Sequence, residues 1–294
     1  MKGSELWVIA GLMAALAAIA GCADFRFAAA NIPALTGSYH RVTGLRYGRD
    51  QREQLDVYVP GGKTVHPVVV FWYGGSWQEG RRGQYRFVGA ALAERGFVTV
   101  VPDYRLYPAV RFPELMDDGA KAVAWAHAHA SEFGGDPERI VLMGHSAGAH
   151  MAALLALDPR YLAAAGVERR SIVGLVGLSG PYALDPNTDA LRTIFSAPYT
   201  PAEWRPVSFA SADSPRTLLI HGVDDSVVSI DHARKLKSAL ESQGVAVESH
   251  FYPGRGHADT IASFSLIARR RTPALQQVVE FIRRVTGGGG ELPR

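Results

Sequence analysis

Short apolar runs alternate with longer helical patterns along most of this chain, and this alternation constrains the fold more than any other feature. Several of the runs are rich in β-branched residues, which is typical of strands buried on both faces. The predicted strands are Leu55–Val59, Val68–Tyr73, Phe97–Val101, Arg139–Met143, Ile172–Leu178, Thr217–Ile220 and Val247–Tyr252. The predicted helices are Gly83–Glu94, Pro113–Phe133, Ala147–Leu157, Asp231–Gln243 and Pro273–Arg284. Strands alternating with helices form βαβ units, so the sequence predicts an α/β fold with a mostly parallel central sheet and helices on both faces.

The composition excludes several other classes of protein. Hydrophobic residues make up 47% of the 294 residues and charged residues 20%, which excludes wholesale disorder, a collagen-like repeat and a polytopic membrane protein. The formal net charge of +3 is small and scattered, so no nucleic-acid surface is expected. A single cysteine excludes an intramolecular disulfide and a multi-cysteine metal site.

The first 21 residues have the pattern of a targeting segment rather than of a folded domain. Leu6–Ala20 is a run of apolar or small residues that is short for a membrane-spanning helix, which needs about 20 residues. Cys22 follows directly, and this arrangement resembles the lipobox of bacterial lipoproteins, whose cysteine is acylated. The resemblance implies a signal peptide over residues 1–21, lipidation at Cys22 and, from Ala23, an outer-membrane lipoprotein facing the periplasm. Cleavage by an ordinary signal peptidase, giving a soluble secreted or periplasmic form, is the alternative.

The remaining chain is expected to form one domain over residues 41–286. Residues 22–40 are predicted to be a tether, and the glycine-rich residues 287–294 a flexible tail. Residues 183–215 contain several prolines and show weak periodicity between two predicted strands, which favours an inserted cap segment.

The sharpest motif is Gly144–Gly148, with the sequence G-H-S-A-G, between a predicted strand and a predicted helix. It fits the pattern G-x-S-x-G in its required context. A serine in such a tight turn projects its hydroxyl above the sheet, and the flanking glycines remove side chains that would clash. The helix N-terminus behind the serine favours developing negative charge. The motif therefore predicts Ser146 as the nucleophile of a hydrolase.

An acid and a base are expected downstream, in the order Ser, Asp, His. Asp224 and Asp225 both follow a predicted strand, and either is suitably placed to be the acid. His257 lies on a glycine-flanked loop beyond the last predicted strand, from which it can reach the serine. We expect His257 to take the serine proton while the aspartate orients the imidazole. His145 and His221 are expected to pack or to hydrogen-bond rather than to react.

The loop after the strand Val68–Tyr73 is predicted to hold the developing oxyanion. Glycines at 74 and 75 allow backbone N–H groups to turn towards a carbonyl oxygen. The N–H of Ala147, the residue after the nucleophile, is the other expected donor. Loss of one such donor typically costs about 100- to 1000-fold in rate.

These motifs together resemble the α/β-hydrolase superfamily of serine esterases. Within it the chain is similar to the bacterial feruloyl esterase and carboxylesterase group, a branch related to arylformamidases. The segments that carry the resemblance are Tyr73–Trp77, Pro102–Pro108, Phe133–Pro137, Gly144–Gly148, His221–Val228 and Gly256-His257. The resemblance implies a carboxylesterase that acts on small acyl or aryl esters through an acyl-enzyme intermediate, with no cofactor and no metal.

The resemblance also assigns residues. The family spacing H-G-x-x-D-x-x-V fits Asp225 as the acid rather than Asp224. The oxyanion donors carried over by position are the N–H groups of Gly75, Ser76 and Ala147. Two positions depart from the family, which often has His in place of Tyr73 and a third Gly in place of Ser76. The aromatic residues that either line a substrate pocket or simply pack in the interior are Trp77, Tyr104 and Tyr182.

Two other functions stay open at this point. An arylformamidase-type amide hydrolase would use the same scaffold and triad. A non-catalytic, envelope-anchored binding module would keep the fold without the activity, although a full triad in order favours an enzyme. The expected partner is a small-molecule ester, with membrane contact only through the lipid anchor, and the sequence does not indicate the oligomeric state.

Overall fold

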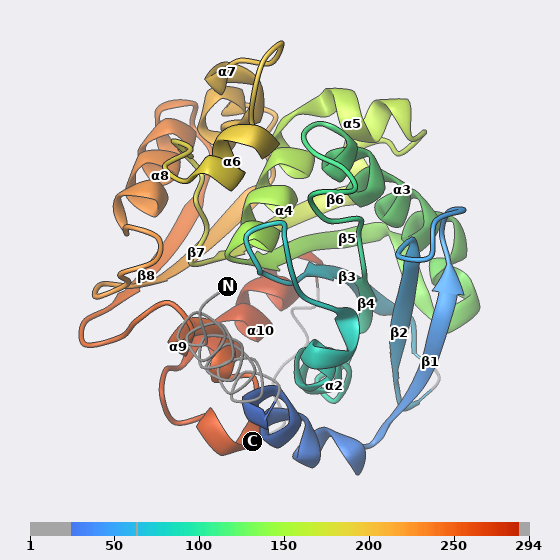
Figure 1. Ribbon diagram of the computed structural model, residues 1–294. Coiled ribbons are helices and arrows are strands. Elements are labelled where there is room, and N and C mark those ends of the chain that lie inside the picture. The colour runs from blue at the N-terminus through green and yellow to red at the C-terminus, as the bar shows by residue number, and fades with distance from the viewer. Residues whose placement is uncertain (1–24, 63, 288–294) are drawn as a thin grey trace, which may run out of the picture.

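An eight-stranded sheet runs through the centre of the computed structural model, which describes residues 25–62 and 64–287 (Figure 1). The strand order is β1-β2-β4-β3-β5-β6-β7-β8. The strands are β1 (Tyr39–Arg46), β2 (Gln54–Pro60), β3 (His66–Trp72), β4 (Val98–Pro102), β5 (Gly135–His145), β6 (Ile172–Leu178), β7 (Arg216–Gly222) and β8 (Val247–Tyr252). β1 and β2 are antiparallel at one edge, and the other strands are parallel. The predicted α/β architecture is confirmed.

Helices cover both faces of the sheet (Figure 1). The α-helices are α2 (Arg86–Ala93), α3 (Glu114–His129), α4 (Ala147–Leu157), α5 (Pro159–Ala164), α6 (Asp189–Ile194), α7 (Pro201–Trp204), α8 (Asp231–Ser242), α9 (Asp259–Ala262) and α10 (Ala274–Val285). The 3₁₀ helices are η1 (Ile32–Leu35), η2 (Arg82–Tyr85), η3 (Ala130–Phe133), η4 (Arg169–Ser171), η5 (Pro206–Phe209) and η6 (Leu266–Ala268). α3, α4 and α8 lie on one face, and α2 and α10 on the other.

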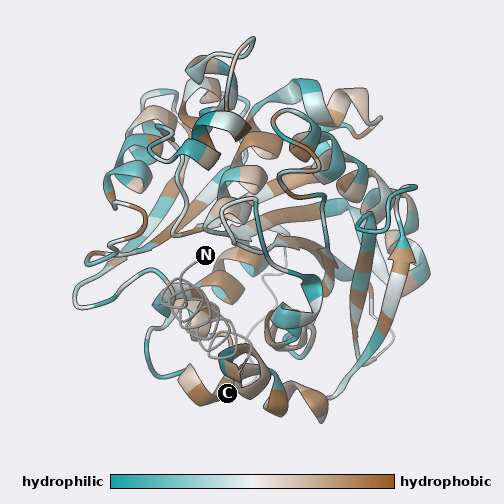
Figure 2. Cartoon of the chain, viewed as in Figure 1, coloured by the Kyte–Doolittle hydropathy of each residue, from teal (hydrophilic) through white to brown (hydrophobic). Residues whose placement is uncertain are grey.

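The core is thickest around the middle strands, where apolar residues face helices on both sides (Figure 2). Every residue of α4 is buried, because the sheet, α3 and η5 enclose it. Its alanines allow this close approach, since a small side chain lets a helix backbone lie near its neighbours. A helix fixed on all sides holds the residue before it, Ser146, in a constant position.

The N-terminal segment differs from expectation. The tether predicted over residues 22–40 is wrong from residue 25 on, because residues 25–31 are helical and β1 begins at Tyr39. Phe27 packs on Tyr85, with 5.0 Å between ring centroids. The Asn31 side chain donates to the carbonyls of Gly83 and Gln84 at 3.1 and 3.0 Å. These partners are more than 50 residues away in sequence, so local pattern gave no sign of them.

The predicted signal peptide, Cys22 and residues 288–294 of the predicted tail lie outside the described residues. In the part of the chain that the structure describes, no helix combines the length and apolarity needed to cross a membrane.

The segment 183–215 folds as a small helical insertion of α6, α7 and η5 after β6. Its aromatic side chains fasten it to the body. Phe195 packs edge-on against Trp77, with 4.8 Å between ring centroids, and the carbonyl of Trp204 accepts a hydrogen bond from His150 at 2.6 Å. The insertion is therefore packed onto α4 and the loop after β3.

Candidate active site

Ser146 occupies a strained turn between β5 and α4. Its backbone has φ 56° and ψ −124°, a region that costs a non-glycine residue about 1–3 kcal/mol. A Cβ on Gly144 would lie 2.1 Å from the carbonyl oxygen of Gly148, and a Cβ on Gly148 would lie 2.1 Å from that of Trp72. Both motif glycines are therefore sterically required. The turn places Ser146 at the carboxyl edge of the sheet, where its N–H donates to Leu178 of β6 at 2.9 Å.

Asp225 and His257 form the second half of the site. His257 Nδ1 lies 2.7 Å from Asp225 Oδ2. The other oxygen, Oδ1, accepts the backbone N–H groups of Val227 and Val228 at 2.9 and 2.8 Å. Burial alone would raise the pKa of Asp225, but the hydrogen bonds from His221, His257 and Val228 outweigh it and hold that pKa well below its usual range. The carboxylate is therefore charged at neutral pH and receives the Nδ1–H of His257.

The structure decides between the two candidate acids. Asp224 is exposed, and its backbone N–H donates to the carbonyl of Arg255 at 3.0 Å. The Asp225 side chain is fully buried beside His257. The structure thus places Asp225, and not Asp224, against the imidazole.

Two further histidines support this pair. His221 Nε2 lies 2.9 Å from the carbonyl of Val228 and 3.1 Å from Asp225 Oδ2. Its Nε2–H therefore stabilises the loop that carries Asp225. His145 Nε2 lies 3.1 Å from the carbonyl of His257 and donates to it. Burial, followed by the nearby His257, lowers the pKa of His145 to about 3, so this imidazole is neutral. The hydrogen-bonding roles expected for His145 and His221 are confirmed.

Ser146 and His257 line one cleft of about 280 Å³. Its other walls are Phe27, Gly74, Gly75, Ser76, Glu79, Gly80, Gln84, Tyr85, His145 and Val227. Two of the three predicted oxyanion donors, Gly75 and Ser76, thus border the nucleophile. Ala147, the third, is the first residue of α4 and follows Ser146 directly.

The loop after β3 has a backbone conformation at Gly75 that requires glycine. Gly75 has φ 131°, and a Cβ there would lie 2.2 Å from the carbonyl oxygen of Glu79. Ser76 and Trp77 also have positive φ, of 52° and 59°. A Cβ on Gly74 would lie 2.8 Å from that of Ser146, so the loop touches the nucleophile. Such a run of unusual backbone turns N–H groups into a concavity that binds anions.

A buried network of hydrogen bonds and ion pairs supports this loop. The Tyr73 hydroxyl donates to Asp103 at 2.7 Å and lies 2.9 Å from Arg52 Nη2. Arg52 also donates to the carbonyl of Gly80 at 2.7 Å, and Asp103 pairs with Arg82. Burial and the Asp103 charge raise the pKa of Tyr73 well above its usual value, so the hydroxyl stays protonated and keeps donating. Tyr73 therefore anchors the loop that begins directly after it.

The predicted aromatic pocket is not formed by the expected residues. Trp77, Tyr104 and Tyr182 are buried, with exposed fractions of 3%, 0% and 0%, and none of them lines the cleft around Ser146. The open alternative, packing in the interior, is the correct one. Phe27 and Tyr85 supply the aromatic wall instead. Phe27 carries no sequence signal for this role, because it belongs to the segment interpreted as a tether.

The described residues contain no group of three or more His, Cys, Asp or Glu side chains arranged to hold a metal ion. The chemistry available in the cleft is that of a buried carboxylate, an oriented imidazole, a serine hydroxyl and backbone N–H groups.

Comparison with solved structures shows the same architecture. The crystal structure of an inhibited esterase B from Lactobacillus rhamnosis superposes with a TM-score of 0.78 at 19% identity, covering 95% of this chain and 97% of the esterase. The chain has the α/β-hydrolase fold. The model of the BD-FAE family matches residues 55–181 of this hydrolase-fold domain, from β2 to just beyond β6.

Curated relatives match a longer stretch of this chain. The isoprenylcysteine alpha-carbonyl methylesterase ICME of Arabidopsis thaliana is 31% identical over 236 residues, which are 72% of this chain and 55% of the plant protein. Esterase LipC of Mycobacterium tuberculosis is 32% identical over 265 residues, 81% of this chain and 64% of LipC. The chain thus spans between half and two thirds of the length of these two relatives.

Proposed function

We propose that this α/β-hydrolase is a serine carboxylic-ester hydrolase that acts on small acyl or aryl esters. One observation carries the proposal: a strained Ser146 shares a cleft with His257, whose Nδ1 is hydrogen-bonded to the buried Asp225. The esterases and methylesterases among its relatives, and the BD-FAE match, support the same reaction class.

The reaction proceeds in two steps, acylation of Ser146 and hydrolysis of the acyl-enzyme. Ser146 Oγ attacks the ester carbonyl carbon, and its proton passes to Nε2 of His257, which is free to accept because Nδ1–H points to Asp225. The carbonyl oxygen becomes an oxyanion that accepts hydrogen bonds from the N–H groups of Gly75, Ser76 and Ala147. Collapse breaks the bond to the alcohol oxygen, and His257 returns the proton to the leaving alcohol. Water then attacks the carbonyl carbon of the acyl-enzyme and gives a proton to His257. Collapse breaks the bond to Ser146 Oγ, His257 returns the proton to that oxygen, and the carboxylic acid is released.

The substrate class follows from the cleft. A volume of about 280 Å³ lies at the low end of ligand clefts, which span roughly 300–1,000 Å³. Phe27 and Tyr85 give it an aromatic wall suited to an aryl group or a short acyl chain. Glu79, also in the wall, places a carboxylate near the bound ester, so neutral esters are favoured over those with an anionic acyl group. The methylesterase name of the plant relative further supports a small leaving alcohol.

We also propose that the protein is an outer-membrane lipoprotein facing the periplasm, anchored through Cys22. The apolar run Leu6–Ala20 and the cysteine directly after its end support this placement. Incorporation of a labelled fatty acid into the wild type, and its loss in Cys22→Ser, would test it. Equal labelling of both proteins would overturn the assignment.

Ester hydrolysis tests the proposed activity. p-Nitrophenyl esters from acetate to laurate, methyl ferulate and N-formylkynurenine would be offered to the wild type and to Ser146→Ala. We expect the highest kcat/KM on the shortest acyl chains or the aryl ester, and loss of activity in the variant. Equal rates in both proteins would contradict the mechanism. Turnover of the formamide alone would contradict the substrate class.

A further inference from the structure

A second and larger cleft, of about 450 Å³, runs along α10 and holds three arginines. Arg95, Arg269 and Arg283 all line it and are partly buried. None of them forms an ion pair within residues 25–62 and 64–287, and the buried Nε of Arg269 has no hydrogen-bond partner. Burial, together with repulsion from Arg269 and Arg283, lowers the pKa of Arg95. Arg95 therefore feels the positive charge of the other two arginines, which the neighbouring Glu94 offsets only in part.

The other charged and polar groups leave this excess of positive charge in place. Glu280 is the acidic residue in the cleft wall, and its carboxylate accepts a hydrogen bond from Gln276 at 2.9 Å. Leu275 brings the first turn of α10 to the cleft, where the helix macrodipole is positive. A phosphate-bearing or other anionic group fits this environment.

Exposed apolar side chains lie on the adjoining elements. In the N-terminal helical segment, Phe25 is 74% exposed, and Ile32, which begins the adjoining 3₁₀ helix η1, is 64% exposed. Phe27 packs inward, so the segment presents apolar residues both to the body and to solvent. In η6, Leu266 and Ile267 are 54% and 65% exposed. Figure 2 shows apolar residues in both segments.

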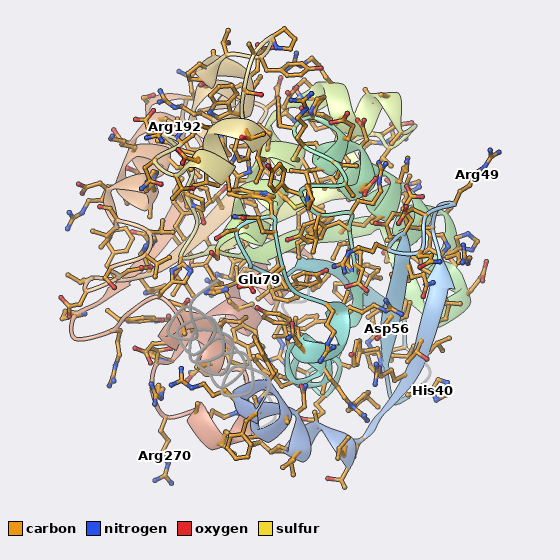
Figure 3. The ribbon with its side chains drawn as sticks, viewed as in Figure 1. His40, Arg49, Asp56, Glu79, Arg192 and Arg270 are labelled. Atoms are coloured by element: carbon orange, nitrogen blue, oxygen red, sulfur yellow. The ribbon has the colours of Figure 1, made fainter. Side chains whose placement is uncertain are left out.

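These features form one continuous face. The Ser265 hydroxyl donates to the carbonyl of Ala30 at 2.9 Å and joins the η6 loop to the N-terminal segment. A smaller groove between them is lined by Leu266 and Arg269, and also by Glu94, and Arg269 continues into the arginine cleft. Arg270 points away from the body on the same side (Figure 3). The N-terminal face consists of Phe25, Ile32, Leu35, Leu266 and Ile267 with Arg95, Arg269, Arg270 and Arg283.

We propose that the N-terminal face docks on a bilayer of anionic phospholipid, with its apolar side chains at the acyl boundary and its arginines on the phosphates. Apolar side chains beside arginines are the combination that surface-bound helices use. The chain also enters this face from its N-terminal side, where the sequence carries the apolar run Leu6–Ala20 and Cys22. If Cys22 is lipidated as proposed above, the attached lipid would hold this face near the bilayer.

The docking places the catalytic cleft beside the lipid. Phe27, on the inner side of the same helical segment, is part of the cleft wall. The proposed docking face and the catalytic cleft therefore share this helical segment.

Vesicle flotation of the full chain tests the docking. Binding to phosphatidylcholine vesicles is compared with binding to vesicles containing a quarter phosphatidylglycerol, so that attachment through residues 1–22 contributes equally to both. The arginine variant is Arg269→Gln/Arg283→Gln, the apolar variant is Leu266→Ser/Ile267→Ser, and the matched control is Arg49→Gln, an exposed arginine at the far side of the molecule (Figure 3). Circular dichroism serves as the folding check for all variants.

Each arginine near an anionic surface typically contributes about a fivefold gain in affinity, so the double arginine variant should lose roughly 25-fold of the phosphatidylglycerol-dependent binding. The apolar variant should weaken binding to both vesicles, and Arg49→Gln should match the wild type. Ser146→Ala should also match it, which separates docking from the proposed esterase activity. An unchanged phosphatidylglycerol preference in the arginine variant would overturn the proposal. Tight binding of inorganic phosphate by a chain with no vesicle preference would overturn it too, in favour of a small-anion site.

Discussion

Replacement of Asp225 by asparagine changes one oxygen to nitrogen in a carboxylate whose surroundings determine where that nitrogen must go. The backbone N–H groups of Val227 and Val228 both donate to Oδ1, at 2.9 and 2.8 Å, so the amide carbonyl oxygen takes that side. The NH₂ group then lies where Oδ2 was, 2.7 Å from Nδ1 of His257, and the Nε2–H of His221, 3.1 Å away, keeps its bond to the Val228 carbonyl. Nδ1 must accept rather than donate, which moves the imidazole proton to Nε2. His257 can then no longer take the proton of Ser146.

The size of the effect follows from two losses. The charge-assisted hydrogen bond that stabilises the imidazolium is worth about 1.5–3 kcal/mol, which alone gives roughly 10- to 150-fold in rate. The wrong tautomer adds to this, and buried triads in which the aspartate becomes asparagine lose about 10⁴-fold in kcat. We expect a loss of that order for Asp225→Asn, with KM little changed.

The assay is steady-state hydrolysis of p-nitrophenyl acetate at pH 7.5, with circular dichroism to confirm folding. Asp224→Asn is the matched control, because it removes the neighbouring, exposed carboxylate and should keep kcat within a few-fold of the wild type. A loss below tenfold in Asp225→Asn, or equal losses in the two variants, would refute the assignment of the acid and the tautomer argument with it.

Three further outcomes are expected. Gly75→Ala should lower kcat at least 100-fold in the same ester assay, because the new Cβ would lie 2.2 Å from a backbone oxygen. Gly83→Ala should leave kcat unchanged, because a Cβ there would have nothing within 4 Å. Because a non-glycine residue is strained at φ 56°, Ser146→Gly should be about 1 kcal/mol more stable than Ser146→Ala in urea unfolding, and a less stable glycine variant would argue against strain. Burial lowers the pKa of His145 to about 3 and that of His150 to about 4, from an ordinary value of 6.5. Between the lowered and the ordinary values, the unfolded chain binds more protons than the folded chain. The free energy of unfolding therefore falls as the pH falls through this range. Each histidine should remove about 2 kcal/mol between pH 8 and pH 5, and His150→Gln should show a shallower pH dependence of its urea midpoint; an unchanged slope would refute this contribution.

The central sheet and the residues around Ser146 could be predicted from the sequence because local pattern determines them. Buried parallel strands read as apolar runs, and β6 and β8 have the predicted bounds. The nucleophile turn imposes glycines at fixed positions, and helix α4 begins at Ala147 as predicted. Asp225 was distinguishable from Asp224 only through a family spacing, since both follow the same strand. The backbone N–H groups that select Asp225 appear only in the folded loop.

The walls of the cleft could not be predicted in the same way, because they depend on contacts between distant segments. Phe27 lies far from Tyr85 in sequence and reaches it because Asn31, at the end of the N-terminal helix, hydrogen-bonds to η2 and α2. β1 also escaped prediction, since it is an edge strand in which no residue is fully buried and apolar residues follow no clear alternation. Trp77 was a reasonable candidate for the pocket by position, but its positive φ turns it towards Phe195 of the insertion.

The most direct test of the account is the site of reaction with a fluorophosphonate probe, read by intact mass and peptide mapping. The triad mechanism predicts one adduct, on Ser146, that is absent in Ser146→Ala. It should form far more slowly in Asp225→Asn and His257→Gln, and at the wild-type rate in Asp224→Asn. A wild type that stays unlabelled, or an adduct that persists in Ser146→Ala, would contradict the claim that Ser146, His257 and Asp225 act together as a nucleophilic triad.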